Sequence, residues 1–94
     1  MMKQKEVLDH LIAKNGIDWQ TTVAIEELAE LTKTLTKALR GQGSRKQIIE
    51  EMADVEICLA QLKIIYVRYP EEFSAFRRFK IRRLELFYAT GELK

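Results

Sequence analysis

The sequence has little cysteine, proline or glycine, and each shortage excludes a kind of structure. Its one cysteine, Cys58, permits no disulfide within the chain and suits a reducing compartment. One proline and four glycines among 94 residues leave few places for turns, which favours a few long helices over many short strands. No stretch approaches the roughly 18 apolar residues of a membrane span, and no signal-peptide pattern opens the chain. We therefore expect a cytoplasmic protein that does not cross a membrane.

The chain is also short and nearly balanced in charge. Ninety-four residues form one domain, residues 1–94, which buries only roughly 60–65% of its unfolded surface. We therefore expect a homodimer or higher oligomer to complete the core. The net charge of +2 is too small to indicate a partner. The acids cluster in the middle of the chain and the bases near its end, so the distribution is more informative than the sum.

Apolar residues recur at helical spacing along the whole chain, and no segment alternates as a strand does. The pattern predicts helices at about residues 3–14, 18–40, 44–69 and 70–89. Because the connections between them are short, consecutive helices should be antiparallel neighbours. The predicted fold class is all-α, a four-helix bundle that dimerisation completes.

Capping signals set the expected ends of these helices. Asp18 is the expected N-cap of the second helix, and Ser44 with Gln47 forms a capping box for the third. Residues 41–43, Gly-Gln-Gly, provide the hairpin between those two helices. Pro70 suits the first position of the fourth helix and ends the third, because the residue before proline avoids helical geometry.

One motif occurs twice in the centre of the chain. The segment IEELAEL at residues 25–31 returns 24 residues later as IEEMADV, with every position identical or conservatively replaced. Because a helix turns about 100° per residue, the acids of each copy lie within an arc of roughly 100° on one helix. These acids are Glu26, Glu27 and Glu30 in the first copy and Glu50, Glu51 and Asp54 in the second. If the two helices pack side by side, six carboxylates surround one small volume, where they could not all stay ionised without a cation.

An ordinary solvated face is the alternative interpretation of these acids. It suits the first copy, because Lys33 follows Glu30 at i+3 and could pair with it. The second copy has no base at i+4, and Glu50 and Asp54 are themselves a like-charge pair that costs about 0.2–0.5 kcal/mol. Alanines at 29 and 53 between the acids would let the two helices approach closely. All-oxygen ligands favour Mg²⁺ or Mn²⁺ over zinc, so the pattern predicts a site for one of these hard cations.

The arrangement Glu26-Glu27-x-x-Glu30, then 20 residues, then Glu51-x-x-Asp54 resembles the E-E-x-x-E … E-x-x-D signature of the MazG-like, all-α nucleoside triphosphate pyrophosphohydrolases. The resemblance covers the two central helices, and the helix order is also similar to that of small family members. It implies Mg²⁺-dependent hydrolysis of a nucleoside triphosphate to a monophosphate and pyrophosphate, with Mn²⁺ as a possible substitute. The metal ligands that it implies are Glu27, Glu30, Glu51 and Asp54.

The same resemblance implies Glu26 and Glu27 as catalytic residues. Glu26 matches the first acid of the signature, either as the base or as a group that supports the ligands. The repeat within this chain adds Glu50 as a further supporting acid.

The fourth predicted helix is basic, with five bases in the seven residues 77–83. One interpretation is a solvated face whose aromatic residues turn inward. Another is that Lys80 and Arg83, at i and i+3, contact a bound triphosphate, within a subunit or across a dimer. Nucleic-acid binding is less favoured, because acids adjoin the bases at both ends of the segment.

Cys58 and Trp19 have structural interpretations, and the whole chain has a non-enzymatic alternative. Cys58 lacks any metal-type or catalytic context, so we expect a small core residue. Trp19 should pack against the first helix, and the alternative is stacking on a substrate ring. The alternative to an enzyme is a non-enzymatic helical interaction module whose acidic face binds a partner and which binds no divalent ion tightly. A family member that binds nucleotides without cleaving them would lie between the two.

Overall fold

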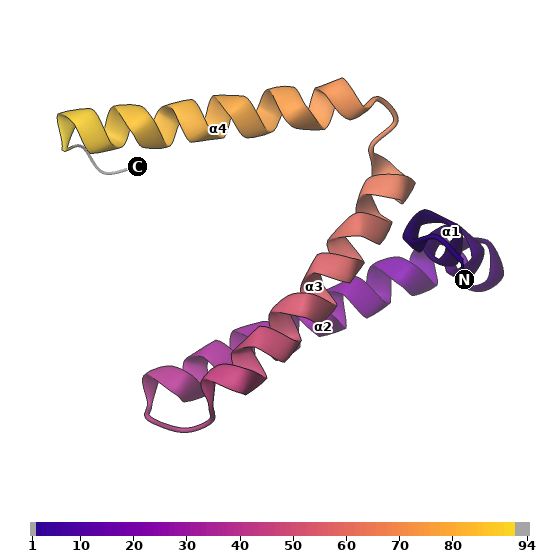
Figure 1. Cartoon of the computed structure of the whole chain (residues 1–94), viewed down its shortest axis with the longest axis horizontal. Helices are drawn as coiled ribbons and strands as arrows, with labels where there is room; N and C mark the ends of the chain where they lie inside the picture. The colour runs from indigo at the N-terminus through magenta and orange to yellow at the C-terminus, as the bar shows by residue number, and fades with distance from the viewer. Residues whose placement is uncertain (1, 92–94) are drawn as a thin grey trace.

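The computed structural model describes residues 2–91, which form four α-helices and, within that range, no strand. The helices are α1 (Gln4–Asn15), α2 (Ile17–Leu39), α3 (Arg45–Tyr66) and α4 (Pro70–Thr90). Figure 1 shows their arrangement. The predicted all-α class and the number of helices are confirmed. None of the four helices combines the length and the apolar content that crossing a bilayer requires.

A single residue, Gly16, separates α1 from α2. Its φ of 92° lies in a region that residues with a side chain rarely adopt, and this conformation lets the chain turn at one residue. The N–H of Gly16 donates to the Ile12 carbonyl at 2.8 Å, and its own carbonyl accepts from the N–H of Gln20 at 3.1 Å. Gly16 is therefore the N-cap of α2, and the prediction of Asp18 is wrong by two residues. Asp18 instead lies in the first turn of α2, where a negative charge favours the helix dipole.

The start of α3 is fixed by the predicted capping box. The N–H of Gln47 donates to Ser44 Oγ at 3.2 Å, and the N–H of Ser44 donates to Gln47 Oε1 at 3.0 Å. Gly43 precedes this pair with a φ of 85°, and a Cβ at this position would lie 3.0 Å from Gln47 Oε1. Glycine therefore allows both the turn and the close approach of the Gln47 side chain.

The sequence predicts that the third helix ends near Tyr69, but α3 ends at Tyr66. This prediction is wrong by three residues. Val67 has φ −93° and ψ 100°, and Tyr69 has φ −122° and ψ 117°, so the backbone is extended on both sides of Arg68. The ring of Pro70 restricts Tyr69 to this region. Residues 67–69 form an elbow, and Pro70 begins α4 as predicted.

α2 and α3 pack side by side as an antiparallel hairpin, and α1 crosses the end of the hairpin nearest the elbow (Figure 1). The buried apolar residues come from these three helices: Leu8 from α1, Ala24 from α2, and Val55 and Cys58 from α3. The prediction that Cys58 is a core residue is confirmed. The core is small because it consists of these few side chains where three helices meet.

α4 lies apart from this core. Within residues 2–91 it has no buried residue and its backbone stays apart from the other helices. Near its start the Phe73 ring faces Lys63 of α3, whose Nζ atom lies 4.3 Å from the ring centroid. Figure 1 shows α4 and the hairpin as the two arms of a V. The prediction that consecutive helices are antiparallel neighbours is therefore wrong for α3 and α4, because the extended elbow does not fold α4 back on the hairpin. The aromatic face of α4 stays exposed as a result, with Phe76 and Phe79 each 63% accessible.

Candidate metal centre

The antiparallel packing of α2 and α3 brings the two copies of the acidic motif together. Glu27 from α2 and Glu51 and Asp54 from α3 each offer one carboxylate oxygen, and these oxygens all lie within 4.8 Å of one another. We call these three residues the carboxylate cluster. They belong to the four metal ligands that the sequence predicts, and they come from both copies of the motif.

Small and apolar residues of the two helices position the carboxylate cluster. Ala24, which is only 2% exposed, lies three residues before Glu27, so Glu27 stands at the edge of the same buried face. On α3, Asp54 adjoins buried Val55 and lies four residues before buried Cys58. The expectation that Ala29 and Ala53 form the close approach is wrong, because both are exposed. Ala24 has that role instead.

Glu51 is the least satisfied acid in the cluster. Its Oε2 atom is buried without a hydrogen-bond partner, although the residue as a whole is half-buried. Burial raises the pKa of the Glu51 carboxyl above its ordinary value, and the negative charges of Asp54, Glu27, Glu30 and Glu50 raise it further. No ion pair joins Glu51 to a base among the described residues. Ionised Glu51 therefore has no directly paired counter-charge within the chain, and a bound cation would provide one.

Cys58 lies close enough to the carboxylate cluster for the negative charges to affect the pKa of its thiol. Burial raises the pKa of the Cys58 thiol, and the charges of Glu27 and Asp54 act in the same direction. The thiol is therefore held in its protonated form, which is a poor metal ligand. The donor set of the cluster is made of carboxylate oxygens, which fit a hard cation such as Mg²⁺ or Mn²⁺.

The other three predicted acids lie outside the cluster. Glu30 is exposed beside it and contributes to the raised pKa of Glu51. Glu50 forms an ion pair with Lys46, whose Nζ atom lies 3.9 Å from Glu50 Oε1. Lys46 is an exposed base that precedes Glu50 by four residues. Glu26 is exposed on α2. The sequence predicts six carboxylates around one small volume. The structure instead brings three of them together, with Glu30 beside them.

A polar pocket of about 210 Å³ adjoins the cluster. It shares Glu30 and Glu51 with the acidic site. Its other lining residues are Lys33, Thr34 and Lys37 from α2 and Gln47 from α3. The expected pairing of Lys33 with Glu30 is not seen among the described ion pairs. The i, i+4 spacing of the two lysines places them on one face of α2, but that spacing alone does not predict a pocket that α3 also lines.

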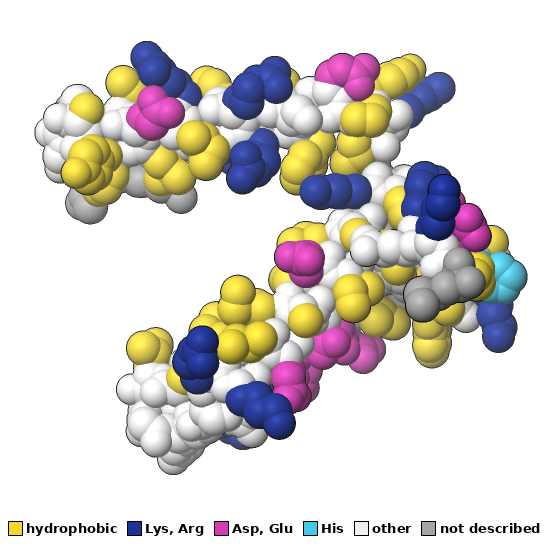
Figure 2. Space-filling model, viewed as in Figure 1, with side chains coloured by type: hydrophobic (Ala, Val, Ile, Leu, Met, Phe, Trp, Pro, Cys, Tyr) yellow, Lys and Arg dark blue, Asp and Glu magenta, His cyan; other side chains and the backbone are white. Residues whose placement is uncertain are grey.

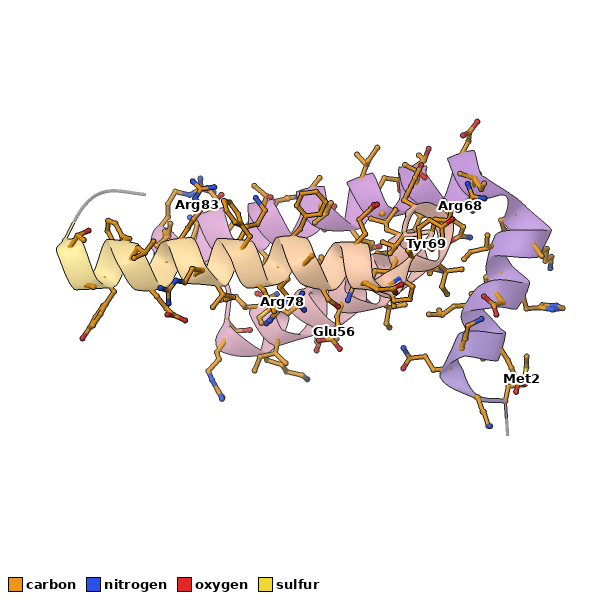
Figure 3. The ribbon with its side chains drawn as sticks, turned by 90° about the horizontal axis from the view of Figure 1, so that it is seen from above. Met2, Glu56, Arg68, Tyr69, Arg78 and Arg83 are labelled. Carbon is orange, nitrogen blue, oxygen red and sulfur yellow. The ribbon has the colours of Figure 1, made fainter. Side chains whose placement is uncertain are left out.

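The basic residues of α4 are not part of this site within one chain. Lys80 and Arg83 lie on the separate arm of the V, and Figure 3 labels Arg83 on the half of α4 away from the elbow. In Figure 2 the acidic side chains of the hairpin gather mainly on its edge away from α4. Arg82 pairs with Glu85 of its own helix at 3.3 Å. A contact from Lys80 or Arg83 to this site would therefore need a second subunit.

Trp19 also departs from its expected role. It is 60% exposed, so the prediction that it packs against the first helix is wrong in the single chain.

Comparison with protein-family models, with curated proteins and with solved structures gives no match for this chain. The resemblance to the MazG-like family therefore rests on the acidic motif itself. Helices α2 and α3 hold the residues of that motif.

Proposed function

We propose that this protein is a Mg²⁺-dependent nucleoside triphosphate pyrophosphohydrolase of the MazG-like kind, with Mn²⁺ as a possible substitute. The observation that supports this proposal is the carboxylate cluster, whose three oxygens lie within 4.8 Å of one another and include a side chain with a buried, unpartnered oxygen. Isolated surface acids would each face water, and none would leave an oxygen unsatisfied. A cytoplasmic location belongs to the same proposal, since the buried thiol of Cys58 would remain reduced there.

The residues of α2 and α3 have distinct roles in this proposal. Glu27, Glu51 and Asp54 would hold the ion, with Glu30 beside them. Bound Mg²⁺ would supply the positive charge that lets carboxylates and a triphosphate share one site. Glu26, the neighbour of Glu27, is exposed and would accept the proton of the attacking water.

The reaction would break one phosphoanhydride bond. The oxygen of water forms a bond to the α-phosphorus, and the bond to the β-phosphate breaks. The electron pair of that bond leaves with pyrophosphate, and the proton of the water passes to the base. The products are a nucleoside monophosphate and pyrophosphate.

Release of pyrophosphate from nucleoside triphosphates in the presence of Mg²⁺ tests this function. Glu51→Gln keeps the shape of the side chain and removes its charge, so we expect activity to fall by at least about a hundredfold, as weakening of a metal site does. Glu56→Gln is the matched control, because Glu56 lies on the same helix outside the cluster (Figure 3) and should retain activity. The proposal fails if metal-loaded wild type releases no pyrophosphate from any nucleotide, or if the two variants are equally active.

The site also needs a second subunit if the bases of α4 take part. We propose a homodimer in which α4 of one chain covers apolar surface of the other. Figure 2 shows hydrophobic side chains on both arms of the V. An apolar pocket of about 400 Å³ lies at the elbow, and Leu59, Leu62, Tyr66 and Phe73 are among its lining residues. The basic segment of α4 and the acidic hairpin are complementary in charge, so a partner's α4 could bring Lys80 and Arg83 to the cluster.

Sedimentation velocity tests the homodimer directly. Wild type should sediment at twice the chain mass of 11.0 kDa, whereas the double change Phe76→Glu and Phe79→Glu should yield a monomer. Lys14→Glu is the control, since Lys14 is an exposed polar residue of α1 and is not part of the apolar surface. A wild-type monomer at all concentrations would contradict the homodimer.

The second candidate function is the non-enzymatic helical interaction module. The observation that favours it is the exposed aromatic face of α4, which would suit a partner protein as well as a second copy. The two candidates differ in their response to divalent ions. An interaction module would show no tight Mg²⁺ binding, and Glu51→Gln would not change its response to Mg²⁺.

A further inference from the structure

The polar pocket beside the carboxylate cluster has an unusual distribution of charge. Its acids, Glu30 and Glu51, stand on the side of the cluster, and its bases are Lys33 and Lys37 on α2. The two lysines are one turn apart, so their side chains project from the same face of the helix. Opposite charges thus meet across one small space, which a ligand with both kinds of partner could fill.

These opposite charges do not neutralise each other in the protein. No ion pair joins either lysine to an acid in the described part of the chain. Both ammonium groups are exposed and free to contact a ligand. An anion that itself binds a cation would satisfy the lysines and the acids together.

The size of the pocket restricts what this anion can be. Pockets that enclose a whole small-molecule ligand usually measure about 300–1,000 Å³. This one measures about 210 Å³, and no aromatic side chain of the described residues lines it. It has room for a short chain of phosphates but offers no surface on which a base could stack. The hydroxyl of Thr34 and the amide of Gln47 are further groups that can donate to phosphate oxygens.

We infer that Lys33 and Lys37 bind the pyrophosphate half of a polyphosphate substrate, next to the cation held by the carboxylate cluster. This inference rests on the proposed function and assigns its phosphate contacts to α2 rather than to α4. The leaving pyrophosphate gains negative charge as the bond to the α-phosphate breaks, and a pair of ammonium groups stabilises that charge. The nucleoside lies outside the pocket, so the pocket itself recognises phosphate and not the base.

Calorimetric titration with inorganic pyrophosphate tests this inference without relying on turnover. Wild type, Lys33→Gln, Lys37→Gln and the control Lys14→Gln are each titrated first with Mg²⁺ alone and then with pyrophosphate in the presence of Mg²⁺. Lys14 is a matched control, because it is an exposed lysine on α1 that does not line the pocket. Lys80→Gln with Arg83→Gln tests the contact from α4. Circular dichroism confirms that each variant is folded.

The expected result is that each pocket lysine variant binds pyrophosphate about tenfold more weakly, close to the loss of one charge-assisted hydrogen bond. Binding of Mg²⁺ alone should be unchanged in those variants, and Lys14→Gln should behave as wild type. Undiminished pyrophosphate binding in Lys33→Gln and Lys37→Gln overturns the inference and leaves the metal site intact. A loss confined to the α4 variant overturns it as well, in favour of a contact across the dimer.

Failure of the proposed function is recognised separately. If wild type binds no Mg²⁺, the proposal of a metal site is wrong. The contacts of Lys33 and Lys37 with phosphate are then tested by pyrophosphate titration without metal. Weaker binding in the two pocket variants alone would still support the lysine contacts. Equal binding in all variants, or no binding to wild type, would overturn them.

Discussion

The α2–α3 hairpin and α4 are built from similar residues but have different environments. Both have regular helices of more than twenty residues, apolar side chains at helical spacing and several charges. The hairpin buries residues of both its helices, whereas α4 buries none in the single chain. Helical periodicity therefore indicates that a face will be covered, but it does not indicate by which surface.

The two regions also begin differently. α3 starts from a reciprocal capping box, while α4 starts from Tyr69, which makes no side-chain cap. Pro70 fixes the first turn of α4 through its own φ and needs no hydrogen bond to do so. The α2–α3 hairpin is thus stabilised by tertiary contacts and a capping box, whereas α4 is stabilised by local helix geometry. Four measurements would break or sharpen this contrast.

The largest expected effect is stabilisation by Mg²⁺. Binding to the folded state alone adds about 2.7 kcal/mol at a hundredfold excess over Kd, which corresponds to a rise in Tm of about 10–20 °C for a domain of this size. Asp54→Asn should remove most of this shift. Hydrogen exchange should show slower exchange in α2 and α3 and unchanged exchange in α4. Equal protection of α4 by Mg²⁺ would show that the two regions respond as one unit.

A matched pair of alanine substitutions should have the next largest effect. Ala24→Leu inserts three heavy atoms into the contact between α2 and α3, and we expect a loss of about 1–3 kcal/mol in the free energy of unfolding. Ala75→Leu makes the same change on exposed α4 and should stay within about 0.5 kcal/mol. Urea denaturation of dilute protein measures both. A comparable loss in Ala75→Leu would mean that α4 is packed in solution.

Removal of the cap on α3 should have a smaller effect. Ser44→Ala deletes the oxygen that accepts from the N–H of Gln47, at a cost of about 1 kcal/mol. Tyr69→Ala at the corresponding position of α4 removes no cap and should change stability by less than about 0.5 kcal/mol. Thermal unfolding of the two variants gives the comparison. Equal losses would show that Tyr69 makes a stabilising contact other than a cap, such as the one between its ring and the Arg68 guanidinium, 5.6 Å from the ring centroid.

The smallest effect concerns pH. The pKa of Glu51 is raised on folding, so folded protein binds a proton at this site more tightly than unfolded protein does. Without metal, stability from this group is present below its ordinary pKa of 4.5 and is lost as pH rises through the raised value. Glu51→Gln should remove this dependence and be more stable than wild type near neutral pH. Metal-free denaturation curves from pH 5 to 8 test it, and identical pH profiles would contradict the assignment.

Local signals predicted most of the fold. The capping box depends only on hydrogen bonds between Ser44 and Gln47, and Pro70 depends only on its own backbone φ. The sequence alone therefore predicted the starts of α3 and α4 correctly. Asp18 was misplaced because Gly16 reaches a backbone conformation that starts α2 two residues earlier. The separation of α4 was missed because the elbow geometry depends on three consecutive residues and on what surrounds α4.

The candidate site was predicted in part for similar reasons. The repeat spacing predicted that Glu27, Glu51 and Asp54 meet, because an antiparallel hairpin brings the two copies opposite each other. The sequence did not predict Lys46 as the partner of Glu50, because Lys46 precedes this acid by four residues, whereas the expected pairs have the base after the acid. The pocket containing Lys33 and Lys37 depends on both helices together, so no pattern within α2 alone reveals it.

The elbow has a consequence for how folding depends on concentration. Residues 67–69 set the direction of α4, and its apolar face stays exposed in the single chain. A dimer built through α4 is then a form of domain swapping, in which part of the folding free energy is intermolecular. By mass action, its melting temperature would rise with protein concentration, and dilution would expose α4 before the hairpin opens.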